Sequence, residues 1–340
     1  MSPARRGGAG RGANRYTTGT RPLIEGALLA ALTVVIALVA IYVPVVGPLL
    51  GLTWAIPVML VHVRHGWRLS ILTVVVAAAL LAVIVGPIEA ILRAAYFGFV
   101  GIAFGYAFRR RLSSSWAILA GSLGSIAAMV VIFGLLLVVF GENQVTLMKT
   151  AYTQAIVQAQ EVYKRFGLDQ NPDIQAQLAG FKAIVSNLDL LLPALLVGSG
   201  VVLSFMNYAV AGAILPRFGH RVEPIRPFAD WRLAPEPVYI GAAVTLGASL
   251  LASRPGLPPL ALTVTKTAAN SLFVLIEYVL FIQGLSVAYD LLVHLRLAKA
   301  MRIVVIALGF TIPPVQYVAM LAGLLDPVMD IRRYWRRNET

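Results

Sequence analysis

The sequence contains no cysteine, and only 13% of its 340 residues are charged. Without cysteine the chain can form no disulfide, thiolate nucleophile or cysteine-ligated metal site. A soluble domain carries about 25% charged residues, whereas here 59% of the residues are hydrophobic and the mean hydropathy is +0.81. This composition predicts an integral membrane protein with several spanning helices in contact with the lipid bilayer.

The motifs of common catalytic sites are also missing. The chain has no G-x-S-x-G nucleophile elbow, no H-E-x-x-H zinc motif and no G-x-x-x-x-G-K-[ST] phosphate loop. His62 and His65 have a spacing that some metal sites use, but no acidic residue is near them in the sequence. We therefore expect no enzyme activity, no cofactor and no metal site.

Positive charges exceed negative charges by 13 at neutral pH. In a soluble protein this excess would suggest nucleic acid, but here lysine and arginine form short clusters between apolar runs, as topology signals do. With the N-terminus in the cytoplasm, 17 basic residues fall in cytoplasmic segments and five in external ones. We therefore expect a cytoplasmic N-terminus and no nucleic-acid partner.

Apolar runs of about 20 residues, the length that crosses a bilayer, recur along the chain. We count eight spans, of which the short run at 48–63 is marginal. A ninth apolar segment at 303–325 is interrupted by Pro313 and Pro314, so it either crosses fully or forms a hairpin. The hairpin would keep the C-terminal arginines in the cytoplasm, as the positive-inside rule favours. The expected spans are 23–43, 48–63, 69–86, 87–108, 116–140, 188–215, 236–253 and 260–290.

The segment 141–187 is polar enough to lie in water, and its apolar residues recur at helical spacing. Asn171 followed by Pro172 is typical of a helix start. The pattern predicts an external helical hairpin, which either caps the bundle or serves as a gate or docking element.

The predicted fold is an all-α polytopic helix bundle. Its parts are a basic cytoplasmic tail (1–21), five spans (22–140), the hairpin (141–187), the later spans with the Pro-broken segment (188–325) and a basic tail (326–340).

The chain resembles the YybS-like family of bacterial multi-pass membrane proteins from about residue 21 to 333. The likeness rests on EGALLAAL, YVPVVG, the HG of HVRHGWR, RFG followed by PFADWRL, FIQGLSV and GLLDPVMDIRR. It implies a helical membrane fold and a location in the bacterial plasma membrane. It implies no particular reaction.

A second resemblance covers only residues 21 to about 140. The GALLAAL start, the short second span and the GP-interrupted later helices are similar to the S components of energy-coupling-factor transporters. In that family an A-x-x-x-A pattern on the first helix contacts the coupling protein, and Ala27 and Ala31 match it. Small residues at this spacing also promote generic helix packing. The chain also continues beyond the usual length of such components.

Four polar residues within the apolar runs are candidates for ligand binding. Glu89 and Arg93 share one face of the fourth span, with Arg93 ~9 Å deep at 1.5 Å per residue. Lys266 lies ~10 Å deep in the last long span, and Asn270 follows it by one turn. Either Arg93 and Glu89 form a structural ion pair, or the surplus positive charge with Lys266 forms an outward-facing site for a small anionic solute.

Glu277 lies 11 residues after Lys266, ~16 Å further along the helix, so the two side chains cannot pair. We expect Gln283 or Tyr106 beside it, or a protonated carboxyl, since burial favours the neutral form. A proton-relay role is the functional alternative.

Two functions stay open at this point. The first is a transporter-like protein that binds a small solute from outside and uses an ion gradient or a partner ATPase. The second is a non-transporting scaffold or regulatory protein that acts through the cytoplasmic loop 217–232, the hairpin and the basic tail. Within that loop, PFADWRL predicts an interfacial turn in which Asp230 balances Arg232.

Overall fold

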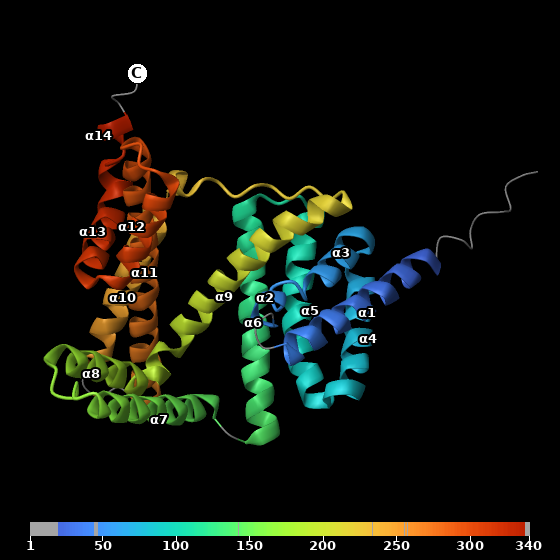
Figure 1. Cartoon of the computed structure of the whole chain (residues 1–340), viewed down its shortest axis with the longest axis horizontal. Helices are drawn as coiled ribbons and strands as arrows, with labels where there is room; N and C mark the ends of the chain where they lie inside the picture. Colours follow the sequence, from blue (N-terminus) through green and yellow to red (C-terminus); the bar gives the residue numbers. More distant parts are fainter. Residues whose placement is uncertain are drawn as a thin grey trace, which may run out of the picture. The chain divides into compact units, whose positions relative to one another are not determined.

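The computed structural model describes residues 20–336 except 44–46, 142, 233, 255 and 257. These residues form helices and connecting segments without a strand, which confirms the predicted all-α fold (Figure 1). Most of the predicted N-terminal tail and the last four residues lie outside the described part. The elements are α1 (Thr20–Tyr42), α2 (Gly47–Leu50), α3 (Ile56–His65), α4 (Trp67–Val85), α5 (Pro87–Arg109), α6 (Ser114–Phe140), α7 (Gln144–Arg165), α8 (Pro172–Ser186), α9 (Leu188–Ile214), η1 (Leu215–Phe218), η2 (Phe228–Asp230), α10 (Pro235–Ala252), α11 (Pro259–His294), α12 (Lys299–Thr311), α13 (Pro313–Met329) and α14 (Arg333–Arg336).

The chain divides into two compact units, each described by itself. Unit 1 comprises Met1–Phe140 and Ser199–Pro224, and unit 2 comprises Gly141–Gly198 and Ile225–Thr340. Helix α9 therefore contributes its first residues to unit 2 and the rest to unit 1. Each unit combines segments that are distant in the sequence.

The core of unit 1 is built around the short helix α3. Residues 56–62 are buried, and α3 packs against α1, α4 and α5. Gly66 ends α3 with a φ of 88°, a left-handed backbone that suits glycine, and α4 begins directly after it. Ten residues rise only ~15 Å, half of the ~30 Å hydrocarbon core, so α3 is buried in the core of unit 1 and is too short to cross a bilayer by itself.

Six helices among the described residues are long and apolar enough to cross a membrane, or seven if the bent pair α12–α13 is one span. The predicted count of eight is therefore not confirmed. The differences arise at 48–63, where α3 is too short, and at 236–253, where the described residues give a shorter apolar helix, Val238–Ala252. Hydropathy detects an apolar run but not the length over which it is helical. The six are α1, α4, α5, α6, α9 with η1, and α11.

Helices α11 and α13 form the centre of unit 2. Helix α13 packs along α11, and α10 packs on α11 as well. Gly284 of α11 permits this approach because a Cβ there would collide with the carbonyl oxygen of Ala319 on α13. Phe281, Leu285 and Ala319 form a buried apolar cluster at the crossing.

The two prolines do interrupt the last apolar segment. Helix α12 ends at Thr311 and α13 begins at Pro313, with a bend of 101° between them. Proline disfavours helical backbone in the residue before it and is tolerated in the first turn of the next helix. The chain therefore does not pass through 303–325 as one straight span, and the returning hairpin stays a prediction.

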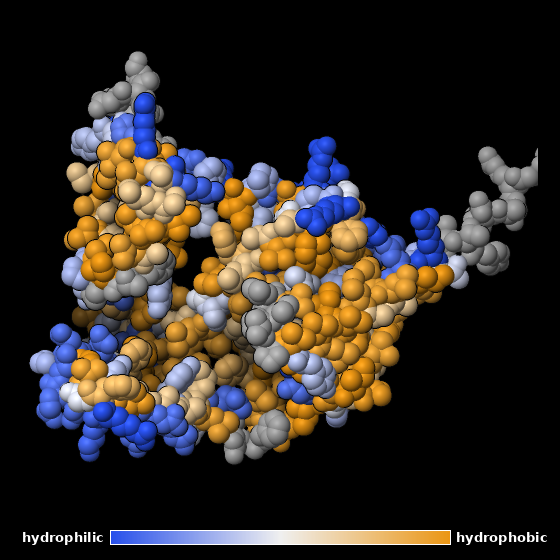
Figure 2. Space-filling model, in the orientation of Figure 1, coloured by the Kyte–Doolittle hydropathy of each residue, from blue (hydrophilic) through white to orange (hydrophobic). Residues whose placement is uncertain are grey.

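Two helices occupy the segment predicted as an external hairpin. The Oδ1 of Asn143 accepts a hydrogen bond from the Val145 N–H at 2.9 Å and so caps α7, and Asn171 caps α8 in the same way through the Asp173 N–H at 2.9 Å. Helices α7 and α8 pack against each other. Figure 2 shows hydrophilic residues gathered on them, whereas hydrophobic residues cover the sides of the long helices. The side of the membrane on which they lie is a prediction.

Candidate functional site

Two of the predicted ligand-binding residues lie at the start of α5 in unit 1. Arg93 Nη2 is 2.9 Å from Glu89 Oε2, which is the local ion pair that the structural alternative expects. The Arg93 guanidinium also lies over the Trp54 ring, 5.7 Å from its centroid. The Glu89 side chain is 53% exposed, so water screens this pair and weakens it.

A row of side chains continues from Arg93 into unit 1. The Trp54 and Tyr96 rings lie 5.6 Å apart between centroids, and Asn207 Nδ2 on α9 donates to the Tyr96 hydroxyl at 3.4 Å. We call Trp54, Glu89, Arg93, Tyr96 and Asn207 the Arg93 row. Three buried atoms in it have no hydrogen-bond partner among the described residues: Trp54 Nε1, Arg93 Nε and Asn207 Oδ1. Two donors and one acceptor are thus available to a ligand.

The other two predicted ligand-binding residues, Lys266 and Asn270, lie near the start of α11 in unit 2. Both side chains are exposed, and Asn270 Nδ2 donates to the Lys266 carbonyl oxygen at 3.0 Å. Within the part of the chain that the structure describes, Lys266 makes no ion pair. Because Arg93 and Lys266 belong to different units, a site shared by both is still a prediction.

Glu277 is half-buried in α11 and makes no hydrogen bond or ion pair with any described residue. Of its two expected neighbours, Gln283 donates to Asp326 Oδ2 at 2.8 Å. Tyr106 belongs to unit 1, where the Arg110 guanidinium lies 5.7 Å from its ring centroid. The proton relay is therefore untested.

Ala27 and Ala31 are exposed on α1. The face of α1 that packs within unit 1 instead contains Gly26, Ala30 and Ala37, which are buried, and α1 packs against α4. The packing stripe is thus shifted by one residue from the A-x-x-x-A pattern. Ala27 and Ala31 are available to a partner, and contact with a coupling protein stays a prediction.

The histidines of HVRHG lie beside residues that are distant in the sequence. His65 Nε2 is 2.8 Å from Glu25 Oε2 on α1, and Arg64 forms an ion pair with the same carboxylate. Arg64 Nε also donates to His220 Nε2 at 3.2 Å, while His62 is buried. No group of three or more metal-ligating side chains was found among the described residues. Arg64 and His65 thus join α3 to α1, and Arg64 also joins α3 to the segment after η1.

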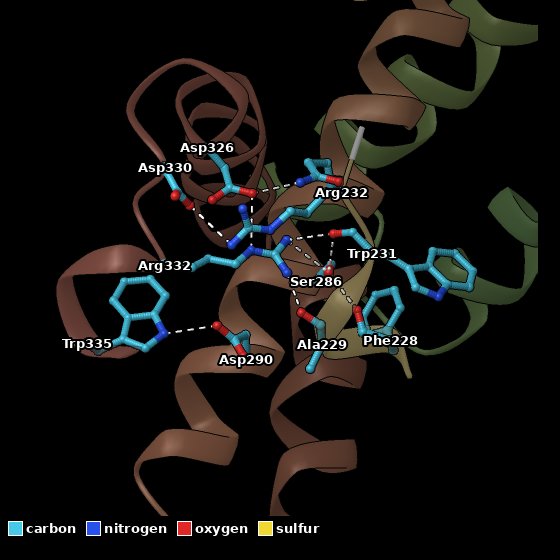
Figure 3. A network of polar contacts seen from close by, with 11 residues as sticks. Phe228, Ala229, Trp231, Arg232, Ser286, Asp290, Asp326, Asp330, Arg332 and Trp335 are labelled. Carbon is cyan, nitrogen blue, oxygen red and sulfur yellow. Dashed lines mark hydrogen bonds and ion pairs between the residues drawn. The ribbon is translucent and has the colours of Figure 1, made fainter. Parts of the chain in front are cut away.

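Arg332 is a fully buried charge in unit 2. Figure 3 shows its guanidinium surrounded by acceptors from several elements. Its Nε donates to Asp326 Oδ2 at 3.1 Å, its Nη2 to the Trp231 carbonyl at 2.8 Å and to Ser286 Oγ at 3.1 Å, and its Nη1 to the Ala229 carbonyl. We call Ala229, Trp231, Ser286, Asp326 and Arg332 the Arg332 clamp. One side chain thereby joins α11, α13 and the segment around η2.

The backbone after α13 brings Arg332 back toward α11. Asp330 ends α13 in the left-handed conformation, with φ 46° and ψ 57°, which aspartate tolerates better than most residues. Further contacts surround the clamp: Ser286 Oγ to the Phe228 carbonyl at 2.6 Å, Gln283 Nε2 to Asp326 at 2.8 Å, Trp335 Nε1 to Asp290 at 3.0 Å, and Arg232 to Asp330 at 3.1 Å. Opposite charges therefore nearly balance in this region.

The energetics of the clamp follow from its burial. Burial lowers the pKa of Arg332, while the charges of Asp326 and Asp290 oppose that shift. Arginine stays protonated in proteins, so its charge must be compensated inside the fold. Removing one partner of a buried pair costs about 3–5 kcal/mol. The clamp is thus a structural element that fixes the η2 segment and the C-terminal segment to α11.

Sequence reasoning did not find the clamp. It treated the C-terminal arginines as topology signals and expected Asp230 to balance Arg232, and it did not predict the ion pair of Arg232 with Asp330 at 3.1 Å. Clamp members are as much as 103 residues apart in the chain, so no local pattern joins them. The available signal was the polar Ser286 and Asp326 within apolar runs, since such residues need partners.

Comparison with known proteins identifies the family. The model of the family described as a predicted membrane protein (DUF2232) matches residues 31–327. The chain belongs to this family. It is similar to the uncharacterized protein YybS of Bacillus subtilis (strain 168), with 29% identity over 313 residues that cover 92% of this chain and 98% of that protein. No solved structure matches the chain. The predicted YybS-like resemblance is confirmed, and the resemblance to S components is not shown.

Three of the stretches that carry the family resemblance meet in the Arg332 clamp. PFADWRL supplies the carbonyls of Ala229 and Trp231, FIQGLSV supplies Ser286, and GLLDPVMDIRR supplies Asp326 and Arg332. The resemblance therefore includes residues that hold unit 2 together and is not limited to apolar spans.

Proposed function

We propose that this family member binds a small anionic solute at the Arg93 row, in a transporter-like role in the bacterial plasma membrane. The observation that carries the proposal is the set of three buried, unpartnered polar atoms in that row. An unpaired buried donor or acceptor costs about 1–3 kcal/mol, so each such atom needs an explanation. A carboxylate or phosphate oxygen would accept from the Trp54 and Arg93 N–H groups, and a hydroxyl or ammonium group would donate to Asn207.

Charge supports an anion as the solute. Arg93 provides a guanidinium, and its partner Glu89 is more than half exposed and therefore screened by water. Lys266 and Asn270 of unit 2 would add a second cation and an amide if the two units share the site. Two cations beside one carboxylate are compensated by a negatively charged ligand.

The transport step needs an energy source outside the motifs of this chain. Because no phosphate-loop motif is present, uphill movement would use an ion gradient or a partner ATPase. Glu277 is the candidate proton relay for the first route, and exposed Ala27 and Ala31 are the candidate contact for the second. No catalytic step is included. The scaffold alternative is less favoured because Arg332, one of its basic tail residues, is buried.

Replacing Trp54 with phenylalanine gives a direct test. Phenylalanine keeps an aromatic ring beneath Arg93 but removes the indole N–H. In thermal-shift screening of purified full-length protein against anionic metabolites, we expect a stabilising compound, since a ligand at 100 times its Kd adds ~2.7 kcal/mol. Trp54→Phe should lose most of that stabilisation. Trp116→Phe, at an exposed tryptophan on α6, is the matched control and should keep it.

Two charge variants separate the contributions of the units. Arg93→Met should abolish the shift in melting temperature, and Lys266→Met should also abolish it if both units form the site. A compound that still stabilises the Lys266→Met variant but not the Arg93→Met variant would restrict the site to unit 1. If the stabilisation survives both Arg93→Met and Trp54→Phe, the compound binds elsewhere and the proposal is wrong.

Introduced cysteines test the side from which the solute enters, because the native chain has none. Single cysteines at Ser113, Gln170 and Arg226 would be exposed to an impermeant thiol reagent on intact cells. The proposal, with its cytoplasmic N-terminus, expects labelling at Gln170 alone. Labelling at Ser113 and Arg226 but not at Gln170 would place the Arg93 row at the cytoplasmic end and contradict binding from outside.

A further inference from the structure

A groove formed by α4, α5 and α6 lies wholly within unit 1 and takes no part in the proposed solute site. Its volume is about 1470 Å³, and apolar side chains line most of it, including exposed Val75, Ile91 and Leu123. Helix α5 lines it from Ile91 to Arg109, which is ~27 Å at 1.5 Å per residue and close to the ~30 Å hydrocarbon core of a bilayer. The groove therefore has the length and polarity to hold an acyl chain.

Positive charge gathers at one end of this groove. The cations Arg68, Arg109 and Arg110 line that end, and the described lining residues include no aspartate or glutamate. Arg109 Nη1 donates to the carbonyl oxygen of His62 at 3.1 Å, which fixes its position. The groove is thus amphipathic along its length, with cations at one end and apolar side chains beyond them.

Two of these cations are free to bind an anion. Arg68 lies over the Trp67 ring at 5.5 Å and Arg110 over the Tyr106 ring at 5.7 Å, measured to the centroids. Both arginines are exposed, and neither forms an ion pair with a described residue. Of the carboxylates near these helix ends, Glu25 is paired with Arg64 and His65, and Glu223 Oε2 accepts from the Ser114 N–H at 3.2 Å. Exposed tryptophan and tyrosine are typical of the headgroup level of a membrane.

We propose that the α4–α5–α6 groove binds one anionic phospholipid, with its phosphate at Arg68 and Arg110 and an acyl chain along α5. Guanidinium groups match phosphate oxygens in bidentate geometry, and basic pockets between membrane helices bind acidic headgroups. A second copy of this chain, packed into the groove by an apolar helix, would leave both arginines without a counter-charge. Charge complementarity therefore selects the lipid over that occupant.

The test compares two lipids on the purified, delipidated full-length protein in detergent. Native mass spectrometry would measure retention of phosphatidylglycerol and of phosphatidylcholine across a titration. We expect preferential retention of one phosphatidylglycerol. Each basic residue near an anionic headgroup contributes about a fivefold change in affinity, so Arg68→Gln with Arg110→Gln should weaken it about 25-fold. Arg217→Gln with Arg221→Gln removes the same charge from exposed residues of unit 1 outside the groove and should change little.

A second pair of variants tests the apolar part independently of charge. Ala78 lines the groove and Ala79 does not. Ala78→Phe should fill the groove and reduce retention of phosphatidylglycerol, whereas Ala79→Phe should leave it unchanged. Equal retention of the two lipids, an equal loss in the Arg217 and Arg221 control, or no effect of Ala78→Phe would each overturn the proposal. Cross-linking of two copies of the chain through a single cysteine introduced at Leu123 would also overturn the proposal, because the second copy would occupy the groove.

Discussion

Arg93 in unit 1 and Arg332 in unit 2 are both arginines among apolar helices, but their surroundings differ. Arg332 is fully buried, and all three of its guanidinium nitrogens donate to acceptors from α11, α13 and the η2 segment. Arg93 is 24% exposed, its ion pair is with a residue four positions away on its own helix, and its Nε has no partner among the described residues.

The difference separates a charge that holds a fold from a charge that is available for binding. A fully satisfied buried network rigidifies its surroundings, and loss of one member leaves the others unpaired. A partly satisfied charge contributes little to stability but offers a donor to a ligand. The comparison therefore predicts that the same type of substitution has opposite consequences for stability and binding in the two units.

The largest effect is expected for Arg332→Met. Loss of the guanidinium leaves Asp326 buried without its ionic partner, so we expect the free energy of unfolding to fall by about 3–5 kcal/mol. Denaturation of the purified protein in detergent, followed by tryptophan fluorescence, measures this change. Arg333→Met, at the exposed neighbouring arginine, should stay within about 0.5 kcal/mol of wild type.

The double variant Arg332→Met with Asp326→Leu distinguishes the pair from general packing. Replacing both members of a buried ion pair by apolar residues is often neutral or stabilising. Recovery of much of the lost stability is therefore expected. If the single Arg332→Met substitution costs no more than Arg333→Met, the clamp does not hold unit 2 together and the contrast with Arg93 fails.

Ser286→Ala is expected to lower the free energy of unfolding by less than Arg332→Met does. The Ser286 hydroxyl donates to the Phe228 carbonyl and accepts from Arg332 Nη2 at 3.1 Å. Hydrogen bonds to charged groups contribute about 1.5–3 kcal/mol, against about 1 kcal/mol for neutral ones. Ser271 is the matched control because its buried hydroxyl donates only to a neutral carbonyl, that of Leu190 at 2.9 Å. If Ser286→Ala and Ser271→Ala lower the free energy of unfolding equally, the contact of Ser286 with the guanidinium does not add to stability.

Local patterns predicted the parts of the fold that local interactions determine. The caps at Asn143 and Asn171 belong to helices α7 and α8, which the 3.6-residue periodicity and the Asn-Pro pair indicated. The predicted count of eight spans is not confirmed at α3, because the apolar run at 48–63 is broken by a turn that leaves only ten residues in that helix. Hydropathy carries no information on that turn.

The candidate sites also divide into contacts between residues close in the sequence, which were predicted, and contacts between distant residues, which were not. The pair of Glu89 with Arg93 was expected because residues four apart in a helix are neighbours. Trp54 and Asn207 were missed as members of the row because they come from other segments of unit 1. The Arg332 clamp was missed entirely, since its donors and acceptors meet only after α11 and α13 have packed.

Glu89→Gln sharpens the comparison from the unit 1 side. An i,i+4 ion pair of this exposure contributes about 0.3–0.5 kcal/mol, so the free energy of unfolding should fall by no more than that. Removing the carboxylate should at the same time strengthen binding of an anionic solute, because repulsion from Glu89 is lost. Glu161→Gln, at an exposed glutamate of α7, is the control for both measurements. A loss of several kcal/mol would instead class Arg93 with Arg332.

Arg64 is a third case, because one of its partners can titrate. Its Nε donates to His220 Nε2 at 3.2 Å, which requires that nitrogen to be unprotonated. Burial and then the charge of Arg64 lower the pKa of His220, while the charge of Glu25 opposes the shift. Protonation of His220 would convert the accepting nitrogen into a donor and place two cations side by side. The other titratable groups at this contact are Glu25, which pairs with Arg64, and His65, which pairs with Glu25.

The expected pH dependence follows from the sign of that shift. Because the pKa of His220 is lower in the folded protein than its ordinary value of about 6.5, the unfolded chain takes up the proton first as the pH falls. The stabilising contact is therefore complete above about pH 6.5 and is lost progressively below it. His220→Gln keeps an acceptor that does not titrate, so its melting temperature should fall less than that of wild type between pH 7.5 and pH 5.5. The change in the free energy of unfolding should be the smallest of those predicted here, within about 0.5 kcal/mol. Equal falls in melting temperature for His220→Gln and wild type across this range would show that the Arg64–His220 contact does not stabilise unit 1.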